Sequence, residues 1–164
     1  MRAAGLVRAA TGAGLTVAVA ESLTAGAVCA RIADVPGASL VLRGGVVAYA
    51  TDVKAGLLGV PDLLLAQRGP VDPDVAVAMA DGVRRRLGAD IGAATTGVAG
   101  PGPADGHDPG TVYIATHDGV RGLAQRLDLT GGRAGVRRGA VDALIDQLCG
   151  VVADRSGPAP GDSR

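Results

Sequence analysis

Short apolar runs of strand-like residues alternate with helical segments along this chain, and this alternation constrains its fold more than any other feature. The expected strands are residues 15–20, 44–50, 91–96, 111–116 and 123–129. The expected helices are residues 6–13, 24–33, 61–67, 73–87 and 135–153, together with a short helix that Asp52 caps. The last two strands follow each other without a helix, which is typical of a hairpin. The pattern predicts a layered α/β/α domain with a mixed β-sheet.

The core of this domain has to be built from aliphatic side chains. Hydrophobic residues make up 48% of the 164 residues, whereas aromatic residues make up only 1%. This length fits one domain, which we place at residues 1–153. The remaining segment, 154–164, is rich in Gly, Pro and Ser and is expected to be a disordered tail.

Charge and composition exclude several classes of function. The 16 basic residues balance the 16 acidic ones, so no general electrostatic attraction to nucleic acid or to an anionic membrane is expected. No apolar run approaches the roughly 18 residues of a membrane span. The two cysteines, Cys29 and Cys149, lie too far apart in sequence to indicate a disulfide framework or a metal site, and His107 and His117 have no ligand-like partners. We therefore expect a cytoplasmic protein without a metal or other cofactor.

One lysine and one glutamate stand out against a strong bias toward Arg and Asp. Lys54 is the only lysine among the 16 basic residues, and Glu21 is the only glutamate among the 16 acidic ones. Arginine keeps its proton at any ordinary pH, whereas a buried lysine can become neutral and act as a base. Position 54 is therefore a candidate general base, the alternative being a solvated lysine that survived by chance.

Serine is also scarce, which limits the nucleophiles available to such a base. Only Ser22 and Ser39 lie outside the C-terminal tail. Ser39 precedes Lys54 by fifteen residues with one expected strand between them, and Tyr49 lies where it can relay a proton or hold the amine. The alternative is a loop serine, a core tyrosine and a solvated lysine.

Three further stretches have the composition of ligand-binding turns. Glu21 to Gly26 joins a strand to a helix, with Ser22 or Thr24 as the expected helix cap, and such a turn aims N–H groups at anions. Residues 95–102 form a strand end and a Gly-rich loop that lets amides approach a phosphate or an oxyanion, although they match no common nucleotide-binding fingerprint. Arg133 and Arg137 share a helix face and are spaced to clamp a phosphate. Each stretch also has an alternative interpretation without a ligand. The first can be a plain helix cap, the second a flexible connection and the third a solvated helix start.

Taken together and in this order, these stretches resemble the competence-damage-inducible (CinA) C-terminal domain family. The resemblance covers roughly residues 6–152. It rests on the segments 20–26 (AESLTAG), 43–49 (RGGVVAY) continuing to Lys54, 57–60 (LLGV), 96–102 (TGVAGPG), 110–112 (GTV) and 132–138. Members of the family include amidases that hydrolyse nicotinamide mononucleotide to nicotinate mononucleotide and ammonia. In many relatives a molybdopterin-binding-like domain precedes this domain, and we expect the domain to be free-standing here.

The resemblance implies a role for each matching position. Ser39 is expected to be the nucleophile, with Lys54 as its base and Tyr49 assisting, while Ser22 is the competing nucleophile. The expected substrate-binding residues are Glu21, Thr24, Gly45, Thr96, Gly97, Gly100, Arg133 and Arg137. Of these, Thr96 and the glycine loop would polarise the amide or hold the phosphate, and Arg133 would face the phosphate.

The chain departs from the family pattern at several of these positions. The family often has Cys-Thr-Gly-Gly where this chain has residues 23–26 (LTAG), Tyr-Ser-Asn where it has residues 49–51 (YAT), and Ser in place of Asp72. These departures bear on the shape of the pocket and on substrate preference more than on the type of reaction.

The expected function is metal-free amide hydrolysis through an acyl-enzyme, with nicotinamide mononucleotide as the small-molecule partner. Two other classes stay open: a catalytically silent pyridine-nucleotide-binding module, and an interaction partner of a competence or DNA-damage-related protein. A symmetric homo-oligomer is the expected assembly, as is usual for small soluble enzymes.

Overall fold

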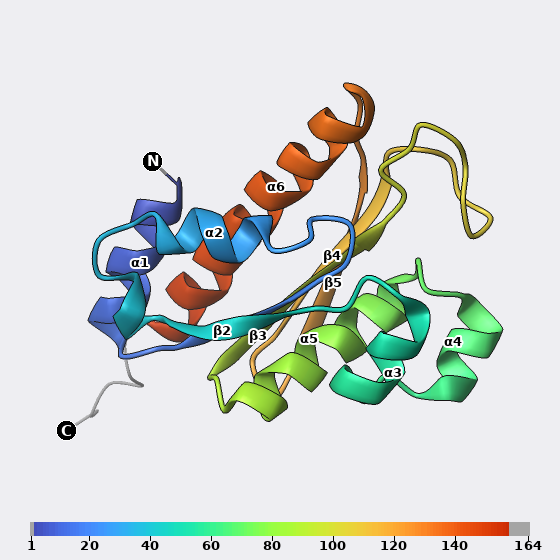
Figure 1. Ribbon diagram of the computed structural model, residues 1–164. Helices are drawn as coiled ribbons and strands as arrows, with labels where there is room; N and C mark the ends of the chain where they lie inside the picture. Colours follow the sequence, from blue (N-terminus) through green and yellow to red (C-terminus); the bar gives the residue numbers. More distant parts are fainter. Residues whose placement is uncertain (1, 158–164) are drawn as a thin grey trace.

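A five-stranded mixed sheet forms the centre of the computed structural model, which describes residues 2–157 (Figure 1). The strands are β1 (Val17–Glu21), β2 (Leu42–Val47), β3 (Ile91–Gly97), β4 (Thr111–His117) and β5 (Gly122–Asp128). Their order in the sheet is β2-β1-β3-β4-β5. Strands β2, β1 and β3 are parallel, and β4 and β5 add an antiparallel hairpin. The predicted α/β domain with a mixed sheet is confirmed.

Helices cover both faces of this sheet. They are α1 (Arg2–Ala13), α2 (Ala27–Ala33), α3 (Thr51–Leu58), α4 (Asp62–Arg68), α5 (Pro73–Leu87) and α6 (Gly132–Arg155), with a short 3₁₀ helix η1 (Ala38–Leu40). Figure 1 shows α1, α2 and α6 on one face, and α5 with its neighbours α3 and α4 on the other. The two faces bury separate apolar cores.

The alternation of large and small residues along β1 gives the two cores different side chains. Val17 and Val19 point into the core under α1, α2 and α6, whereas Ala18 and Ala20 face α5. On that second face Gly92 carries no side chain where a Cβ would collide with the carbonyl oxygen of Ala80 in α5. Small residues on this face let α5 lie close against the sheet, so the core closes without aromatic side chains.

Helix α6 is longer than the sequence predicted at both ends. It begins at Gly132 rather than Gly135, and it ends at Arg155 rather than Ala153. The expected tail therefore starts two residues later than predicted, after a last turn in which the Ser156 hydroxyl donates to the Val152 carbonyl. Residues 158–164, the rest of that expected tail, lie outside the described residues.

Within residues 2–157, no helix combines the length and the apolar character needed to cross a membrane. In the same range, no three His, Cys, Asp or Glu side chains are grouped closely enough to hold a metal ion.

Candidate active site

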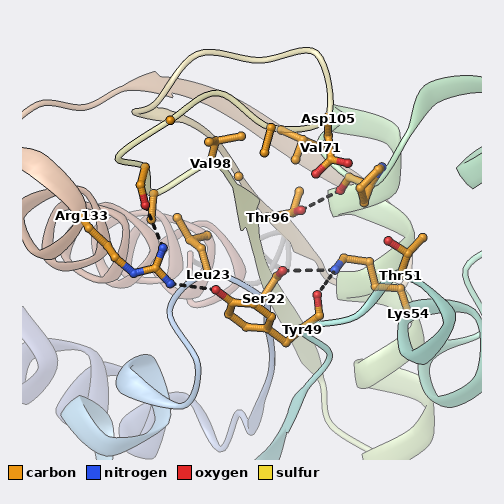
Figure 2. Close-up of a pocket in the computed structure, with 16 residues that line it drawn as sticks. Ser22, Leu23, Tyr49, Thr51, Lys54, Val71, Thr96, Val98, Asp105 and Arg133 are labelled. Carbon is orange, nitrogen blue, oxygen red and sulfur yellow. Dashed lines mark hydrogen bonds between the residues drawn. The ribbon is translucent and has the colours of Figure 1, made fainter.

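A concave site that contains a lysine, a serine and a tyrosine lies at the carboxyl ends of the three parallel strands. It is a cavity of about 220 Å³, lined by the turn after β1, the segment between β2 and α3, and the loop between β3 and β4 (Figure 2). In the sheet, β2 lies on one side of β1 and β3 lies on the other, so the chain connections from this point run in opposite directions. Ligands of open α/β sheets bind at such a switch point, so the fold itself favours this position.

Lys54 is the chemical centre of this cavity. It belongs to α3, only 1% of its surface is exposed, and it is the largest fully buried side chain among the described residues. Its Nζ lies 3.1 Å from Ser22 Oγ, 2.9 Å from the Ala48 carbonyl oxygen and 3.3 Å from the Tyr49 carbonyl oxygen. Figure 2 shows the amine pointing from α3 toward Ser22. The lysine singled out by composition is thus buried and in contact with a serine.

This hydrogen-bonding pattern suits a neutral amine. As an ammonium group, Lys54 donates three hydrogen bonds, to Ser22 Oγ and to the two carbonyl oxygens. A neutral amine keeps two N–H donors and one lone pair. Because the carbonyl oxygens of Ala48 and Tyr49 can only accept, the two N–H groups stay with them. The lone pair is then left to accept the Ser22 hydroxyl proton.

Burial also favours the neutral form. Desolvation lowers the pKa of Lys54 from 10.5 to about 8, while the negative charge of Asp105 acts in the opposite direction. At pH 7 a pKa of about 8 leaves roughly a tenth of the lysine molecules neutral. A base with this pKa works close to physiological pH.

Ser39 does not stand beside this lysine, so the predicted pairing of Ser39 with Lys54 is wrong. Ser39 is exposed in η1, before the start of β2, whereas Lys54 follows the end of that strand. Six strand residues separate the two ends of β2, which is roughly 20 Å of extended chain. The structure brings the competing serine, Ser22, to the amine instead.

The turn that carries Ser22 is anchored by Glu21 rather than by a hydroxyl cap. Glu21 is 1% exposed, and its carboxylate accepts from the backbone N–H groups of Gly26, Val28 and Cys29 at 2.9–3.1 Å. The expected cap was Ser22 or Thr24, and that expectation is wrong, because Glu21 holds the start of α2. Glu21 was also expected to bind substrate, but it is not among the residues that line the cavity.

Thr24 is likewise a structural residue. Its hydroxyl lies 2.9 Å from the Thr95 hydroxyl, it is fully buried, and it does not line the cavity. Ser22, the residue after β1, lies level with Thr96, since Glu21 pairs with Thr95 across the two strands. The backbone N–H of Leu23, which also lines the cavity, has no hydrogen-bond acceptor within residues 2–157.

The glycine-rich segment forms one wall of the cavity as predicted. Thr96, Gly97 and Gly100 all line it. Gly97 has φ of 158°, and a Cβ there would lie 2.6 Å from the Thr111 carbonyl oxygen, so a side chain would push the loop away from β4. The Thr96 hydroxyl donates to the Pro70 carbonyl at 2.6 Å, and it therefore has no proton left to offer a substrate oxygen.

Arg133 and Tyr49 form the opposite rim. Arg133 donates to the Tyr49 hydroxyl and to the Gly100 carbonyl, each at 2.9 Å. The Tyr49 hydroxyl therefore faces Arg133, and only its backbone carbonyl touches Lys54 (Figure 2). Tyr49 does not hold the lysine amine through its hydroxyl as predicted.

The two remaining expected binding residues lie outside the cavity. Gly45 is on the edge strand β2, where a Cβ would collide with the Cys29 sulfur, so this glycine serves the packing of α2. Arg137 donates to the carbonyl oxygens of Leu23 and Thr24 at 2.9 Å. The predicted clamp of Arg133 and Arg137 on one phosphate is wrong, because the two guanidinium groups bind different partners.

Sequence reasoning missed Asp105, which lines the cavity from the tip of the loop between β3 and β4. Figure 2 shows its carboxylate above Thr96. The Gly-rich stretch identified in the sequence ended at Gly102, three residues short of this side chain. Nothing in the sequence marks Asp105 among the many aspartates, and only the length of the loop signals that it reaches over the strand ends.

Comparison with known proteins shows the family of this chain. The family model of the CinA C-terminal domain matches residues 2–152. The chain belongs to this family. A CinA-like protein of Frankia casuarinae is 49% identical over 140 residues, which is 84% of this chain and 32% of that protein. A CinA-like protein of Geobacter sulfurreducens is 43% identical over 136 residues, or 82% of this chain and 33% of that protein. The CinA C-terminal domain described here thus spans about a third of the length of the curated relatives it matches.

Solved structures of the CinA superfamily share its fold. The superfamily protein from Klebsiella pneumoniae superposes with a TM-score of 0.90 at 29% identity, covering 93% of this chain and 96% of that one. A competence/damage inducible protein from Agrobacterium tumefaciens gives a TM-score of 0.84 at 31% identity, covering 92% of this chain and 96% of that one.

The structure explains how this CinA domain tolerates its departures from the family pattern. Asp72, in place of Ser, caps α5 by accepting from the N–H groups of Asp74 and Val75, which is the same service a serine provides. Ala25, in place of Gly, adopts a left-handed φ of 51°, a conformation that glycine takes without strain. Ala50, in place of Ser, leaves α3 without a side-chain cap. None of these three residues lines the cavity, whereas the other two departures, Leu23 and Thr51, do.

Proposed function

We propose that this domain is an amidohydrolase that converts nicotinamide mononucleotide to nicotinate mononucleotide and ammonia, with Ser22 as nucleophile and Lys54 as base. The observation that carries the proposal is the 3.1 Å contact between the buried amine and the Ser22 hydroxyl, inside a cavity. A serine next to a lysine that can lose its proton at neutral pH is the pairing that activates a hydroxyl nucleophile.

The proposed first step transfers the Ser22 hydroxyl proton to the Lys54 amine while Ser22 Oγ bonds to the carboxamide carbon. The carbonyl oxygen gains negative charge, and the unpaired Leu23 N–H beside Ser22 is the donor we assign to it. The backbone N–H of the residue after a nucleophile performs this task in other hydrolases that place a serine between a strand and a helix. One such donor is worth roughly 10²–10³ in rate.

In the second step the bond between the carbonyl carbon and the amide nitrogen breaks, and the nitrogen takes the proton from Lys54 and leaves as ammonia. Lys54 is again neutral and deprotonates a water molecule. The resulting hydroxide attacks the acyl carbon, and the Ser22 oxygen leaves with the proton that Lys54 returns. The products are a carboxylic acid and the original serine, so protons and atoms balance without any other reagent.

Arg133 supports a phosphate-bearing substrate. Its guanidinium lies at the cavity rim, exposed, and is held by neutral partners, the Tyr49 hydroxyl and the Gly100 carbonyl. No carboxylate within residues 2–157 forms an ion pair with it, so its charge remains available to a phosphate.

The test is ammonia release from nicotinamide mononucleotide by the purified chain in the presence of a chelator. Ser22→Ala is expected to reduce turnover by at least about 10³-fold, in line with the loss of a catalytic nucleophile. Ser39→Ala is the matched control, because that serine is exposed and outside the cavity, and it should leave turnover unchanged. Loss of activity in Ser39→Ala but not in Ser22→Ala would refute the assignment. Binding of the mononucleotide without ammonia release would indicate a binding module instead of an enzyme.

A further inference from the structure

A second cavity lies between α2 and α6, apart from the candidate active site. It measures about 190 Å³, and its lining is Ala27, Arg31, Ala134, Arg137, Arg138 and Val141. It shares no lining residue with the cavity around Lys54. Figure 1 shows α2 and α6 as neighbouring helices on the same face of the sheet.

Positive charge dominates this second cavity. Its lining contains three arginines and no acidic residue. Arg31 is compensated by Asp142 at 3.3 Å. Neither Arg137 nor Arg138 has a carboxylate within ion-pair distance in residues 2–157. Two guanidinium charges are therefore left uncompensated over a floor of alanine and valine, where a less polar environment strengthens attraction to an anion.

Arg137 connects this cavity to the turn that carries Ser22. Its Nε donates to the Leu23 carbonyl and one Nη2 hydrogen donates to the Thr24 carbonyl. A guanidinium group has five N–H donors, so three remain for a ligand. An anion bound to those donors would fix the Arg137 side chain, and through it the two carbonyls that follow the serine.

We propose that the cavity between α2 and α6 binds a phosphate monoester dianion, and that its occupancy stabilises the Ser22–Thr24 turn through Arg137. Arg138 supplies the second guanidinium, and the geometry of two forked cations suits the three oxygens of a terminal phosphate. The binding half of this inference is independent of the proposed amidase function. Only its consequence for turnover rests on that function.

The binding test is a titration of the full chain with inorganic phosphate and then with ribose 5-phosphate, followed by NMR of backbone amides at constant ionic strength. Amides of α2 and of residues 137–141 in α6, which lie beyond the first turn that carries Arg133, are expected to shift. Arg138→Gln should weaken binding about tenfold, the change expected for one lost charge-assisted hydrogen bond. Arg8→Gln is the matched control, since it removes the same charge from an exposed position on α1 that makes no ion pair among the described residues.

A third variant separates the two cavities. Arg133→Gln removes the guanidinium at the rim of the candidate active site and should leave the shifts in α2 and α6 intact. Shifts that are abolished by Arg133→Gln, or that are weakened equally by Arg138→Gln and Arg8→Gln, would overturn the inference. The measurement needs no ammonia release, so its failure is distinguishable from failure of the amidase proposal.

The coupling is tested by amide hydrogen exchange of residues 22–27. Phosphate is expected to slow exchange in this turn in the parent chain, and to have no effect there in Arg137→Gln, which lacks the link to the Leu23 and Thr24 carbonyls. Arg138→Gln covers the case in which Arg137→Gln fails to fold, because the Arg138 side chain, unlike that of Arg137, makes no hydrogen bond within residues 2–157. In Arg138→Gln the effect should need about tenfold more phosphate. Phosphate binding in α2 and α6 without slower exchange in the turn would contradict the coupling.

Discussion

Lys54 shows how burial turns an ordinary residue into a reactive one. Its amine is removed from water and held by two backbone carbonyl oxygens that accept hydrogen bonds whether or not it is charged. Because these carbonyls carry no full negative charge, they compensate the ammonium form only in part, and desolvation prevails. An arginine in the same place would stay protonated, so the strong preference of this chain for Arg could not extend to position 54.

The charge of Asp105 contributes to the pKa of Lys54 and can be removed by a single substitution. It raises the pKa of Lys54 against the larger lowering by burial. Asp105→Asn is therefore expected to move the pKa of Lys54 below about 8, so that the acid limb of the activity profile shifts to lower pH. The measurement is kcat/KM against pH, with Asp108→Asn as a control that removes a charge from the same loop. A shift to higher pH in Asp105→Asn, or an equal shift in the control, would contradict this electrostatic role.

At the scale of single elements, α3 is the helix on which the chemistry depends, since it carries Lys54 and begins directly after Tyr49 and Ala50. Ala50 occupies its N-cap position with extended backbone angles and offers no side-chain acceptor. The first N–H groups of α3 therefore lack a side-chain partner. The helix is held mainly by packing and by the burial of Lys54 and Leu58.

Ala50→Ser should supply the missing cap. We expect the free energy of unfolding to rise by about 1 kcal/mol, because a serine hydroxyl at the N-cap accepts from one of the first N–H groups. Urea denaturation measures the change. Ala66→Ser, an exposed position inside α4, is the control and should be neutral or slightly destabilising. Equal effects of the two substitutions would show that the gain does not come from capping.

At the scale of the whole molecule, the position of the site depends on how closely α5 approaches the sheet. Gly92 in β3 faces the Ala80 carbonyl of α5, and Gly82 in α5 faces the Leu58 carbonyl of α3, with no room for a Cβ at either glycine. These contacts set the spacing between the sheet, α5 and α3. They therefore set the distance between the strand end that carries Ser22 and the helix that carries Lys54.

Gly92→Ala tests this packing. The added methyl group would collide with the Ala80 carbonyl and lie 2.8 Å from the Arg84 Cβ, so α5 has to move. We expect a loss of about 2–3 kcal/mol in the free energy of unfolding, measured by denaturant titration. Gly5→Ala is the control, because its Cβ would meet nothing within 4 Å, and in helix α1 it should be neutral or stabilising. Equal stability of the Gly92→Ala variant and the parent would refute the close packing.

The fold could be predicted because its helices and strands follow from the order of apolar and polar residues within short segments. The site could not, because it depends on contacts between segments that are distant in the sequence. The apolar strand predicted at residues 15–20 and the hairpin predicted from strands 111–116 and 123–129 follow from short-range rules, and the structure contains both. The contact between Ser22 and Lys54 arises only when β1 and β2 pair in parallel and bring their carboxyl ends together. Proximity in the sequence favoured Ser39. In the structure Ser39 lies before the start of β2, whereas Lys54 follows its end.

The capping role of Glu21 could not be predicted from the sequence either, because it also depends on how the chain folds back on itself. A glutamate after a strand usually points to solvent, and nothing local indicates that its carboxylate turns back to three N–H groups of the following helix. The same holds for Arg137, whose partners are carbonyls more than a hundred residues earlier in the chain. Their charges suggested ligand binding, and the structure assigns both to the support of the Ser22 turn.

The central claim is that Lys54 loses its proton with a pKa of about 8, and the chain offers a direct test because it contains only one lysine. Labelling lysine with ¹³C at Cε should give a single NMR resonance from the folded protein, whose shift can be followed against pH. A midpoint of about 8 that coincides with the acid limb of kcat/KM is the predicted result. A midpoint near the ~10.4 of an exposed lysine would show that the amine is charged at neutral pH and would contradict its assignment as the base.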